Sequence, residues 1–304
     1  MWYTYAKYIL WEEIIMRTSE ELKQLLIEIR DNDYNVPDGT DVDSIIADML
    51  KFIGHTDAEL RDKLIEKTFM QWGEYKGIIS PEKMKEILGV CLSNTHLFYG
   101  IGENGTDSVF TRSFSSLVVS VAFCMQDEKP FLSAEEVNKI KETVLHYISL
   151  EKDYRGYVDG KGWAHAVAHI ADALYNIVGC GKVIDIDGEG FSVGRNGMLE
   201  VLEAIKKLAC NKALVYDAND DERLADATMV VIWRKLLTNS EIIAWLDSLN
   251  MKDSEYWKGT MPYDCYLHVN RKNFMRSLYF KLLADGNYEE ICKFMLGFLV
   301  ESGD

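Results

Sequence analysis

The stretch Ser133-Ala-Glu-Glu-Val-Asn-Lys-Ile-Lys-Glu-Thr-Val-Leu-His-Tyr-Ile-Ser-Leu150 decides the fold class. Ser133 and Glu136 stand at the spacing of a capping box, in which each side chain accepts a hydrogen bond from the backbone N–H of the other residue. Apolar side chains then recur at helical spacing, at Val137, Ile140, Val144 and Ile148. The stretch therefore predicts an amphipathic helix with a defined start.

The same signals recur along the chain. Thr18-Ser-Glu-Glu21 is a second capping box, and Ser80-Pro81 places a proline at the first helical position. Glycine follows two of the later apolar runs, at Gly179 and Gly286, where a helix is expected to end. Alternation with period two is nearly absent, and Val183-Ile-Asp-Ile186 is the best strand candidate. We therefore predict an all-α protein.

Predicted helix starts recur about every 20 to 25 residues, so a helix pair recurs at about the 40-residue spacing of helical-repeat arrays. This spacing favours a HEAT- or armadillo-like helical-repeat fold, a right-handed α-α superhelix. A compact multi-helix bundle is the alternative, because no motif repeats at that period. No long polar linker divides the chain, so residues 16–304 are expected to form one domain.

Residues 1–15 are expected to be a non-native or mis-started N-terminal extension. Trp11-Glu12-Glu13 can be encoded by TGG-GAG-GAA, which contains the bacterial ribosome-binding sequence GGAGG, just upstream of Met16. From Met16 the chain runs directly into the helix cap at Thr18. A genuine N-terminal helix is the alternative.

Composition limits the classes of function. A net charge of −16 repels nucleic-acid phosphates and anionic lipids, and no basic patch offsets it, so neither nucleic acid nor a membrane is an expected partner. No uninterrupted apolar run approaches the roughly 20 residues of a membrane span. The cysteines show no short pair spacing, which indicates buried thiols in a reducing, cytoplasmic compartment. They are Cys91, Cys124, Cys180, Cys210, Cys265 and Cys292.

The segment Gly162–Val178 is predicted to be the helix that carries a candidate site. One face of it holds four polar residues at positions i, i+4, i+7 and i+11, namely His165, His169, Asp172 and Asn176. Alanines flank this stripe and allow neighbouring helices to approach closely, so we expect the stripe to line an interior groove. We expect both histidines to be mostly buried. At least one should bond to a side chain from another segment, with Asp153–Asp159 as the expected source.

Two histidines one turn apart, with a carboxylate on the same face, can bind a divalent metal ion or act as a general base. Ala166 stands where the metalloprotease pattern requires glutamate, which argues against that class. The structural alternative is a satisfied hydrogen-bond network that fixes helix packing. We favour the network, with ligand binding, metal binding and catalysis as alternatives. No cofactor is expected.

The segment Asp153-Tyr-Arg-Gly-Tyr-Val-Asp-Gly-Lys-Gly162 leads into that helix, whose free N–H groups favour anions. An ordered turn that caps the helix is the favoured interpretation. The segment adds four candidate groove residues, Asp153, Arg155, Tyr157 and Asp159, and Trp163 in the predicted helix is a fifth. Arg112 lies among apolar residues and is a further candidate. It predicts a buried ion pair, with Asp153 or Asp159 as the expected partner.

Three segments carry a family resemblance: Gly105–Leu117, Arg155–His169 with Asp172-Ala-Leu174, and Asn270–Tyr279. They are similar to a bacterial family catalogued as domain-of-unknown-function family 2785, and the likeness extends over most of the chain from about Met16. The resemblance implies an α-helical, repeat-like protein and implies no activity.

The leading functional hypothesis is a non-enzymatic helical-repeat binding or scaffold protein, whose polar inner groove holds a partner protein or a small ligand. The alternative is an enzyme, or a protein that binds a metal ion or small ligand, centred on His165, His169 and Asp172.

Overall fold

The computed structural model describes residues 17–183, 192–249 and 258–301. Of these residues, 67% are helical, about twice the one-third average of globular proteins, which confirms the all-α prediction. Residues 1–15 and most of the strand candidate Val183-Ile-Asp-Ile186 lie outside the described residues.

The first half of the chain contains α1 (Ser19–Asp31), α2 (Val42–Lys51), α3 (Glu66–Met70), α4 (Pro81–Cys91), α5 (Ser108–Glu128) and α6 (Ala134–Leu150). Two π-helical turns continue α3 on either side, η3 (Glu59–Ile65) and η4 (Gln71–Tyr75). A short antiparallel hairpin of β1 (Tyr157–Val158) and β2 (Gly162–Trp163) follows. The second half contains α7 (Ala166–Gly179), α8 (Arg195–Ala209), α9 (Asp220–Trp233), α10 (Asn239–Leu249), α12 (Tyr263–Asp285) and α13 (Glu289–Glu301).

Local capping chemistry sets several helix ends. Both predicted capping boxes form, at Thr18 with Glu21 and at Ser133 with Glu136. Ser80 caps α4 ahead of its N-terminal proline. Gly286 ends α12 in the left-handed conformation, with φ of 79°, which glycine adopts without strain.

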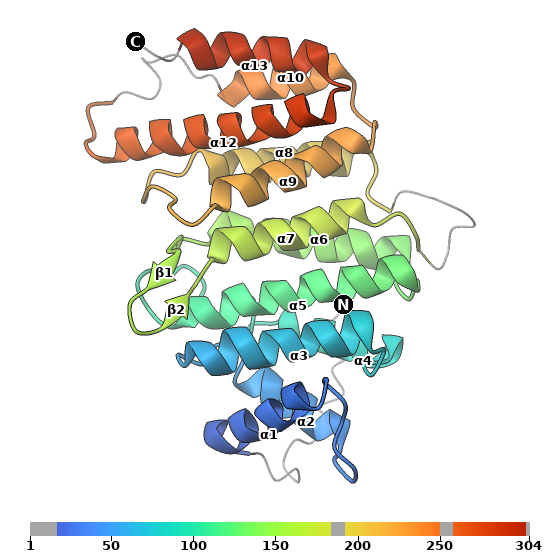
Figure 1. The fold of residues 1–304 in the computed structure, drawn as a ribbon. Coiled ribbons are helices and arrows are strands. Elements are labelled where there is room, and N and C mark those ends of the chain that lie inside the picture. Colours follow the sequence, from blue (N-terminus) through green and yellow to red (C-terminus); the bar gives the residue numbers. More distant parts are fainter. Residues whose placement is uncertain (1–16, 184–191, 250–257, 302–304) are drawn as a thin grey trace.

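The helices form two adjoining rows (Figure 1). One row runs through α3, α5, α7, α9 and α12, each packed on the next, while α6 and α8 pack on each other and against the α7 and α9 pair. One continuous hydrophobic core extends from Leu22 in α1 to Phe298 in α13. This packing fits the multi-helix bundle, and the right-handed repeat superhelix stays a prediction.

The sequence showed no apolar run long enough for a membrane span, and helix α5 corrects this statement. It is long and apolar enough to cross a membrane, although serines and Arg112 interrupt its apolar residues. In the structure, 78% of its most apolar window is buried against other parts of the chain. It packs between α3, α4 and α7, as the core helix of a helical protein does.

Candidate functional site

The candidate site begins at the junction between the β-hairpin and α7. The sequence predicted a helix from Gly162, but α7 begins at Ala166 and Gly162 belongs to β2. His165 is the residue before the helix and has a left-handed backbone, with φ of 49° and ψ of 36°. His165 therefore lies outside the helix, and the prediction that it shares a helical face with His169 is wrong.

Arg61 in η3 holds the hairpin in this position. The guanidinium of this fully buried arginine donates hydrogen bonds to the carbonyl oxygens of Lys161 at 2.8 Å and Trp163 at 3.2 Å. Gly162 lies against η3 so closely that a Cβ there would be 2.6 Å from the Cβ of Ala58. Its φ of 80° also suits glycine, so a turn of hairpin replaces the first predicted turn of helix.

The same guanidinium stacks over two aromatic rings of α5, 4.2 Å from the centroid of Phe110 and 4.8 Å from that of Phe114. Its Nε lies 2.8 Å from Oδ1 of Asp62, but the two atoms lack hydrogen-bond geometry. Burial raises the pKa of Asp62 to about 6. Arg61 thus joins η3, α5 and the hairpin, and nothing in the local sequence pattern pointed to it.

His169 is bonded to α5. Its Nδ1 lies 2.7 Å from Oγ of Ser113, and that hydroxyl in turn donates to the carbonyl oxygen of Ala164. Because the serine hydrogen is used for Ala164, the network assigns a proton to Nδ1 of His169 and leaves a lone pair on Nε2. The prediction of a buried histidine bonded to another segment is confirmed, but Asp153–Asp159 is not the source.

Burial first, and then electrostatic repulsion from His165 and Arg223, hold the pKa of His169 well below its ordinary value. The imidazole is therefore neutral at physiological pH. Its ring also meets Phe114 edge-on, with the centroids 4.9 Å apart. These contacts are those of a satisfied packing residue.

His165 is less well satisfied. Its ring stacks on Trp163, with centroids 4.2 Å apart, and meets His169 edge-on at 5.4 Å. Its Nε2 is buried and has no hydrogen-bond partner within the described part of the chain. Burial, and then the charge of Arg223, lowers its pKa to about 4. A left-handed, non-glycine residue with an unpaired buried nitrogen stores unfavourable energy, which is common at functional sites.

Asp172 and Asn176 lie in a different place, a surface groove of about 280 Å³ between the outer faces of α3, α5 and α7. The stripe was expected to line one interior groove, but only its second half lines this groove, which opens at the surface. The groove is lined by Glu66, Met70, Glu74, Leu117, Ser120, Val121, Cys124, Asp172, Tyr175, Asn176 and Arg223.

The polar groups of the groove are partly paired. Asn176 donates to Oγ of Ser120 at 2.7 Å, which ties α7 to α5. Arg223 in α9 reaches Oδ1 of Asp172 at 2.7 Å. Burial raises the pKa of both Asp172 and Glu66, although Arg223 opposes this for Asp172 and Lys67 for Glu66. Sequence spacing did not identify Glu66 or Arg223, because they come from other helices.

A metal ion bound by the predicted triplet is not supported. Among the described residues, no group of three or more His, Cys, Asp and Glu side chains is arranged to hold a metal ion. The physical reason is that His165 lies outside the helix, while Asp172 faces the groove and Arg223.

Asp220 is a further residue that the sequence did not single out. It is the first residue of α9, and its fully buried carboxylate accepts a hydrogen bond at 3.2 Å from the backbone N–H of Ala168, in the first turn of α7. The other carboxylate oxygen has no partner among the described residues, and burial raises the pKa to about 6. Asp220 thus begins α9 and also caps the neighbouring α7.

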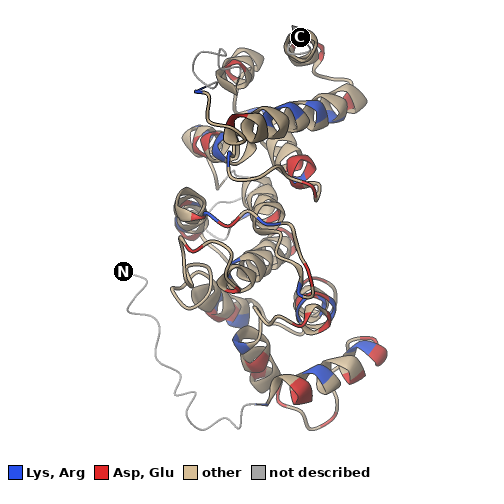
Figure 2. Cartoon of the chain, turned by 90° about the vertical axis from the view of Figure 1, so that its left-hand side faces the viewer, with Lys and Arg blue, Asp and Glu red and all other residues tan. Residues whose placement is uncertain are grey.

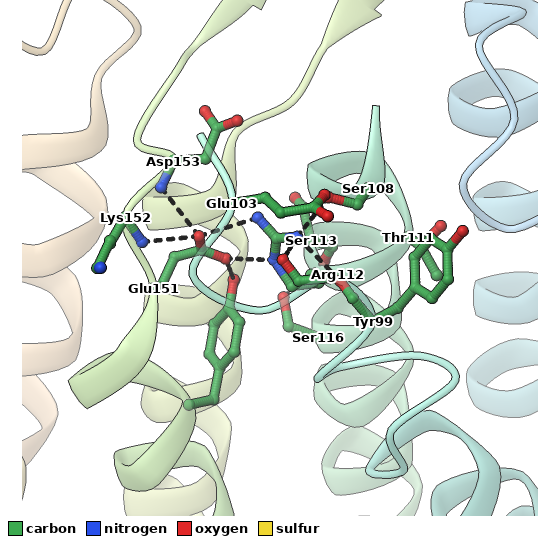
Figure 3. A network of polar contacts seen from close by, with 12 residues as sticks. Tyr99, Glu103, Ser108, Thr111, Arg112, Ser113, Ser116, Glu151, Lys152 and Asp153 are labelled. Atoms are coloured by element: carbon green, nitrogen blue, oxygen red, sulfur yellow. Dashed lines mark hydrogen bonds and ion pairs between the residues drawn. The ribbon is translucent and has the colours of Figure 1, made fainter. Parts of the chain in front are cut away.

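Arg112 forms the predicted buried ion pair, with a different partner. Its guanidinium makes two bonds to Glu151, of 2.6 Å and 3.0 Å, and both side chains are almost fully buried (Figure 3). The hydroxyl of Tyr147 and the backbone N–H groups of Lys152 and Asp153 donate to the same carboxylate. With this many bonds the carboxylate is satisfied, so the network fixes structure rather than offering a site.

The remaining candidates lie along the hairpin. Asp153 is buried, pairs with Arg155 at 2.6 Å and accepts a bond from the N–H of Gly105. Tyr157 and Trp163 are paired across the two strands, with both rings exposed. Asp159 is exposed in the turn. None of these residues lines the groove.

Comparison with known proteins gives a family and no activity. Residues 97–280 match the family described as "Protein of unknown function (DUF2785)", a span that includes the hairpin, α5, α7 and α9. No curated protein and no solved structure matches the chain. Because the match covers more than half of the chain, this protein belongs to the DUF2785 family.

Proposed function

We propose that this protein is a non-enzymatic binding protein and that the groove between α3, α5 and α7 holds its ligand. The observation that carries the proposal is the groove itself, a cavity of about 280 Å³ whose wall combines polar and charged side chains with apolar and aromatic ones in similar share. Ligand sites are concave, and their placed polar groups fix the orientation of the ligand and provide specificity.

Four features favour binding over catalysis. No histidine lines the groove, and its one thiol, Cys124, has its pKa raised by burial to about 11, which disfavours the nucleophilic thiolate. The Asp172 carboxylate is already paired with Arg223, and the Ser120 hydroxyl accepts from Asn176. This arrangement supplies complementary contacts for a ligand and no nucleophile with its own base.

A matched pair of variants tests the location. Cys124→Trp places a large side chain in the groove, and Cys265→Trp makes the same change in α12, outside it. Ligands found by thermal-shift screening of a metabolite library are then measured by calorimetry. We expect wild type and Cys265→Trp to bind equally and Cys124→Trp to lose binding. Unchanged affinity in a folded Cys124→Trp protein would refute the proposal.

The histidine pair supports a second candidate, a ligand or catalytic site at the hairpin. The supporting observation is the strained His165 with its unpaired buried Nε2. His169→Ala separates the two interpretations. If His169 is a packing residue, its replacement should lower the free energy of unfolding by about 1 kcal/mol or more. If His169 binds a ligand, its replacement should leave the free energy of unfolding unchanged or raise it, while ligand binding is lost.

A further inference from the structure

The groove is lined by more negatively than positively charged side chains. Its lining contains three carboxylates, those of Glu66, Glu74 and Asp172, and one cation, Arg223. The residue types on the rest of the wall are neutral. The cavity therefore favours a positive ligand over a negative one, because a ligand there faces more negative than positive groups.

The cation in the groove is the guanidinium of Arg223, which a ligand can displace from Asp172. Arg223 is half exposed, and its ion-pair contact in the described chain is the one from Nη1 to Asp172 at 2.7 Å. The Asp172 side chain is less accessible, at 23% exposure. An exposed ion pair of this kind is weak, because water competes for the guanidinium and the long side chain gains entropy when released. A second cation can take the same place at Asp172.

Glu66 offers a second anionic contact on the opposite wall. Its side chain is 17% exposed, and its ion-pair partner is the more exposed neighbour Lys67 at 3.2 Å. Burial raises the pKa of Glu66 and of Asp172, and the negative charge of Glu66 adds to the rise for Asp172. Each carboxylate is thus held where its charge is costly, and a cation between α3 and α7 lowers that cost.

The remaining wall suits an aliphatic stem. Met70 and Leu117 line the groove near the carboxylates, and the half-exposed ring of Tyr175 adds an aromatic surface. Methionine adapts to flexible chains, and an aromatic face attracts an ammonium or guanidinium group.

We infer that the groove binds an organic cation, an ammonium or guanidinium group on a short apolar stem, which displaces Arg223 from Asp172. This inference rests on the proposed function and specifies the chemistry of its ligand. The cation comes either from a free small amine or from a lysine or arginine side chain of a partner protein.

The test compares three probes of equal length and different head charge: pentylamine, pentanol and pentanoate. Binding is measured by ligand-detected NMR and calorimetry on the full chain at low ionic strength. We expect pentylamine to bind at least tenfold more tightly than the other two. Asp172→Asn and Glu66→Gln should each weaken pentylamine at least tenfold, whereas Glu135→Gln should not, because Glu135 is an exposed acid on α6, outside the groove.

Arg223→Gln gives a result that a general effect of negative charge does not predict. Removal of the competing cation Arg223 should strengthen pentylamine binding several-fold. The control Arg276→Gln on α12 makes the same change in net charge without removing that cation. N-acetyl-lysine amide then separates the two sources. Binding as tight as that of pentylamine indicates a protein side chain, and exclusion of the amide indicates a free amine.

The outcomes distinguish this inference from the proposed function. Failure of pentylamine to bind at millimolar concentration, or equal binding of pentanoate, overturns the cation inference and leaves the groove proposal to its own library test. Pentylamine binding that survives in Cys124→Trp also overturns the cation inference alone, because the amine would then bind outside the groove, whereas a library ligand that binds equally to wild type and Cys124→Trp overturns the groove proposal.

Discussion

At the scale of single residues, the buried charges differ in how well they are satisfied. Arg112 and Glu151 bond to each other twice and to several further groups, so neither ion is left without partners. Asp220 is equally buried, yet one carboxylate oxygen is unpaired. The two cases lead to opposite expectations for replacement.

Removal of one member of the Arg112–Glu151 pair should be severe. Arg112→Met leaves a buried carboxylate without its counter-ion, which typically costs about 3 to 5 kcal/mol. Glu151→Leu likewise leaves the buried guanidinium of Arg112 without its counter-ion. The double variant should lose clearly less than the sum of the two, because no unpaired charge remains. Urea unfolding of the four proteins measures this, and strictly additive losses would show that the pair is not coupled.

Asp220→Asn should become relatively more stable as the pH rises. The folded pKa of about 6 lies above the ordinary value of 3.8, so between these values the unfolded chain releases its proton first. The wild type therefore loses stability as the pH rises through this window, and asparagine does not. Asparagine also keeps an oxygen for the N–H of Ala168.

We expect the stability difference between variant and wild type to change by about 1 to 3 kcal/mol between pH 4 and pH 8 in favour of the variant. Urea unfolding at several pH values measures it. Asp221→Asn, one residue further on and bonded to Ser277, controls for the loss of one charge at the helix start. A pH-independent difference for Asp220→Asn would contradict the assignment of strain to this carboxylate.

At the scale of elements, local and distant interactions determine different boundaries. Thr18, Ser80 and Ser133 cap their helices with their own side chains, so the sequence nearby was enough to predict α1, α4 and α6. The start of α7 was placed four residues too early, since Arg61 bonds to carbonyls about a hundred residues further along the chain. No pattern within a helix-length window contains that information.

The candidate site divides in the same way. Asp172 and Asn176 both lie inside α7, so helical spacing correctly placed them on one groove. His165 lies before the helix, where spacing no longer applies. Glu66 and Arg223 enter the groove from α3 and α9, and helix-to-helix packing brings them there. Spacing along one helix predicted part of one wall and could not predict the others.

The left-handed turn at His165 makes a testable contribution to the hairpin–α7 junction. Both His165→Gly and His165→Ala remove the ring that stacks on Trp163, so they differ mainly in backbone freedom. Glycine accepts a φ of 49° without strain and alanine does not. We expect the glycine variant to be more stable than the alanine variant by about 0.5 to 1 kcal/mol.

Chemical denaturation of the two variants measures this difference directly. Equal stabilities, or a more stable alanine variant, would mean that the junction relaxes to a right-handed backbone once the ring is gone. The comparison uses two variants of one position, so the loss of the imidazole and its effect on His169 cancel.

At the scale of the whole molecule, the continuity of the core determines how the chain unfolds. Most buried apolar residues form one cluster from α1 to α13, beside a small second cluster at the hairpin, and each helix of the α3 to α12 row packs on the next. Basic and acidic residues are mixed along the helices rather than separated into two faces in the view of Figure 2. Neither packing nor charge divides the described chain into halves.

We therefore predict a single cooperative unfolding transition. Far-ultraviolet circular dichroism reports the helices of the whole chain. Two buried tryptophans report its ends, Trp72 in η4 and Trp245 in α10, and each donates a hydrogen bond to a backbone carbonyl from a distant part of the sequence. The fluorescence of each is isolated by subtracting the curve of Trp72→Phe or Trp245→Phe from that of the wild type.

The three curves should have the same midpoint in urea, because a break at any helix interface exposes core on both sides of it. A long helical array with weak interfaces behaves differently, and its ends unfold separately. Midpoints that differ between Trp72 and Trp245 would show that α7 and its neighbours transmit little stability between the ends. The groove, whose walls come from α3, α5, α7 and α9, would then depend on the stability of its own segment alone.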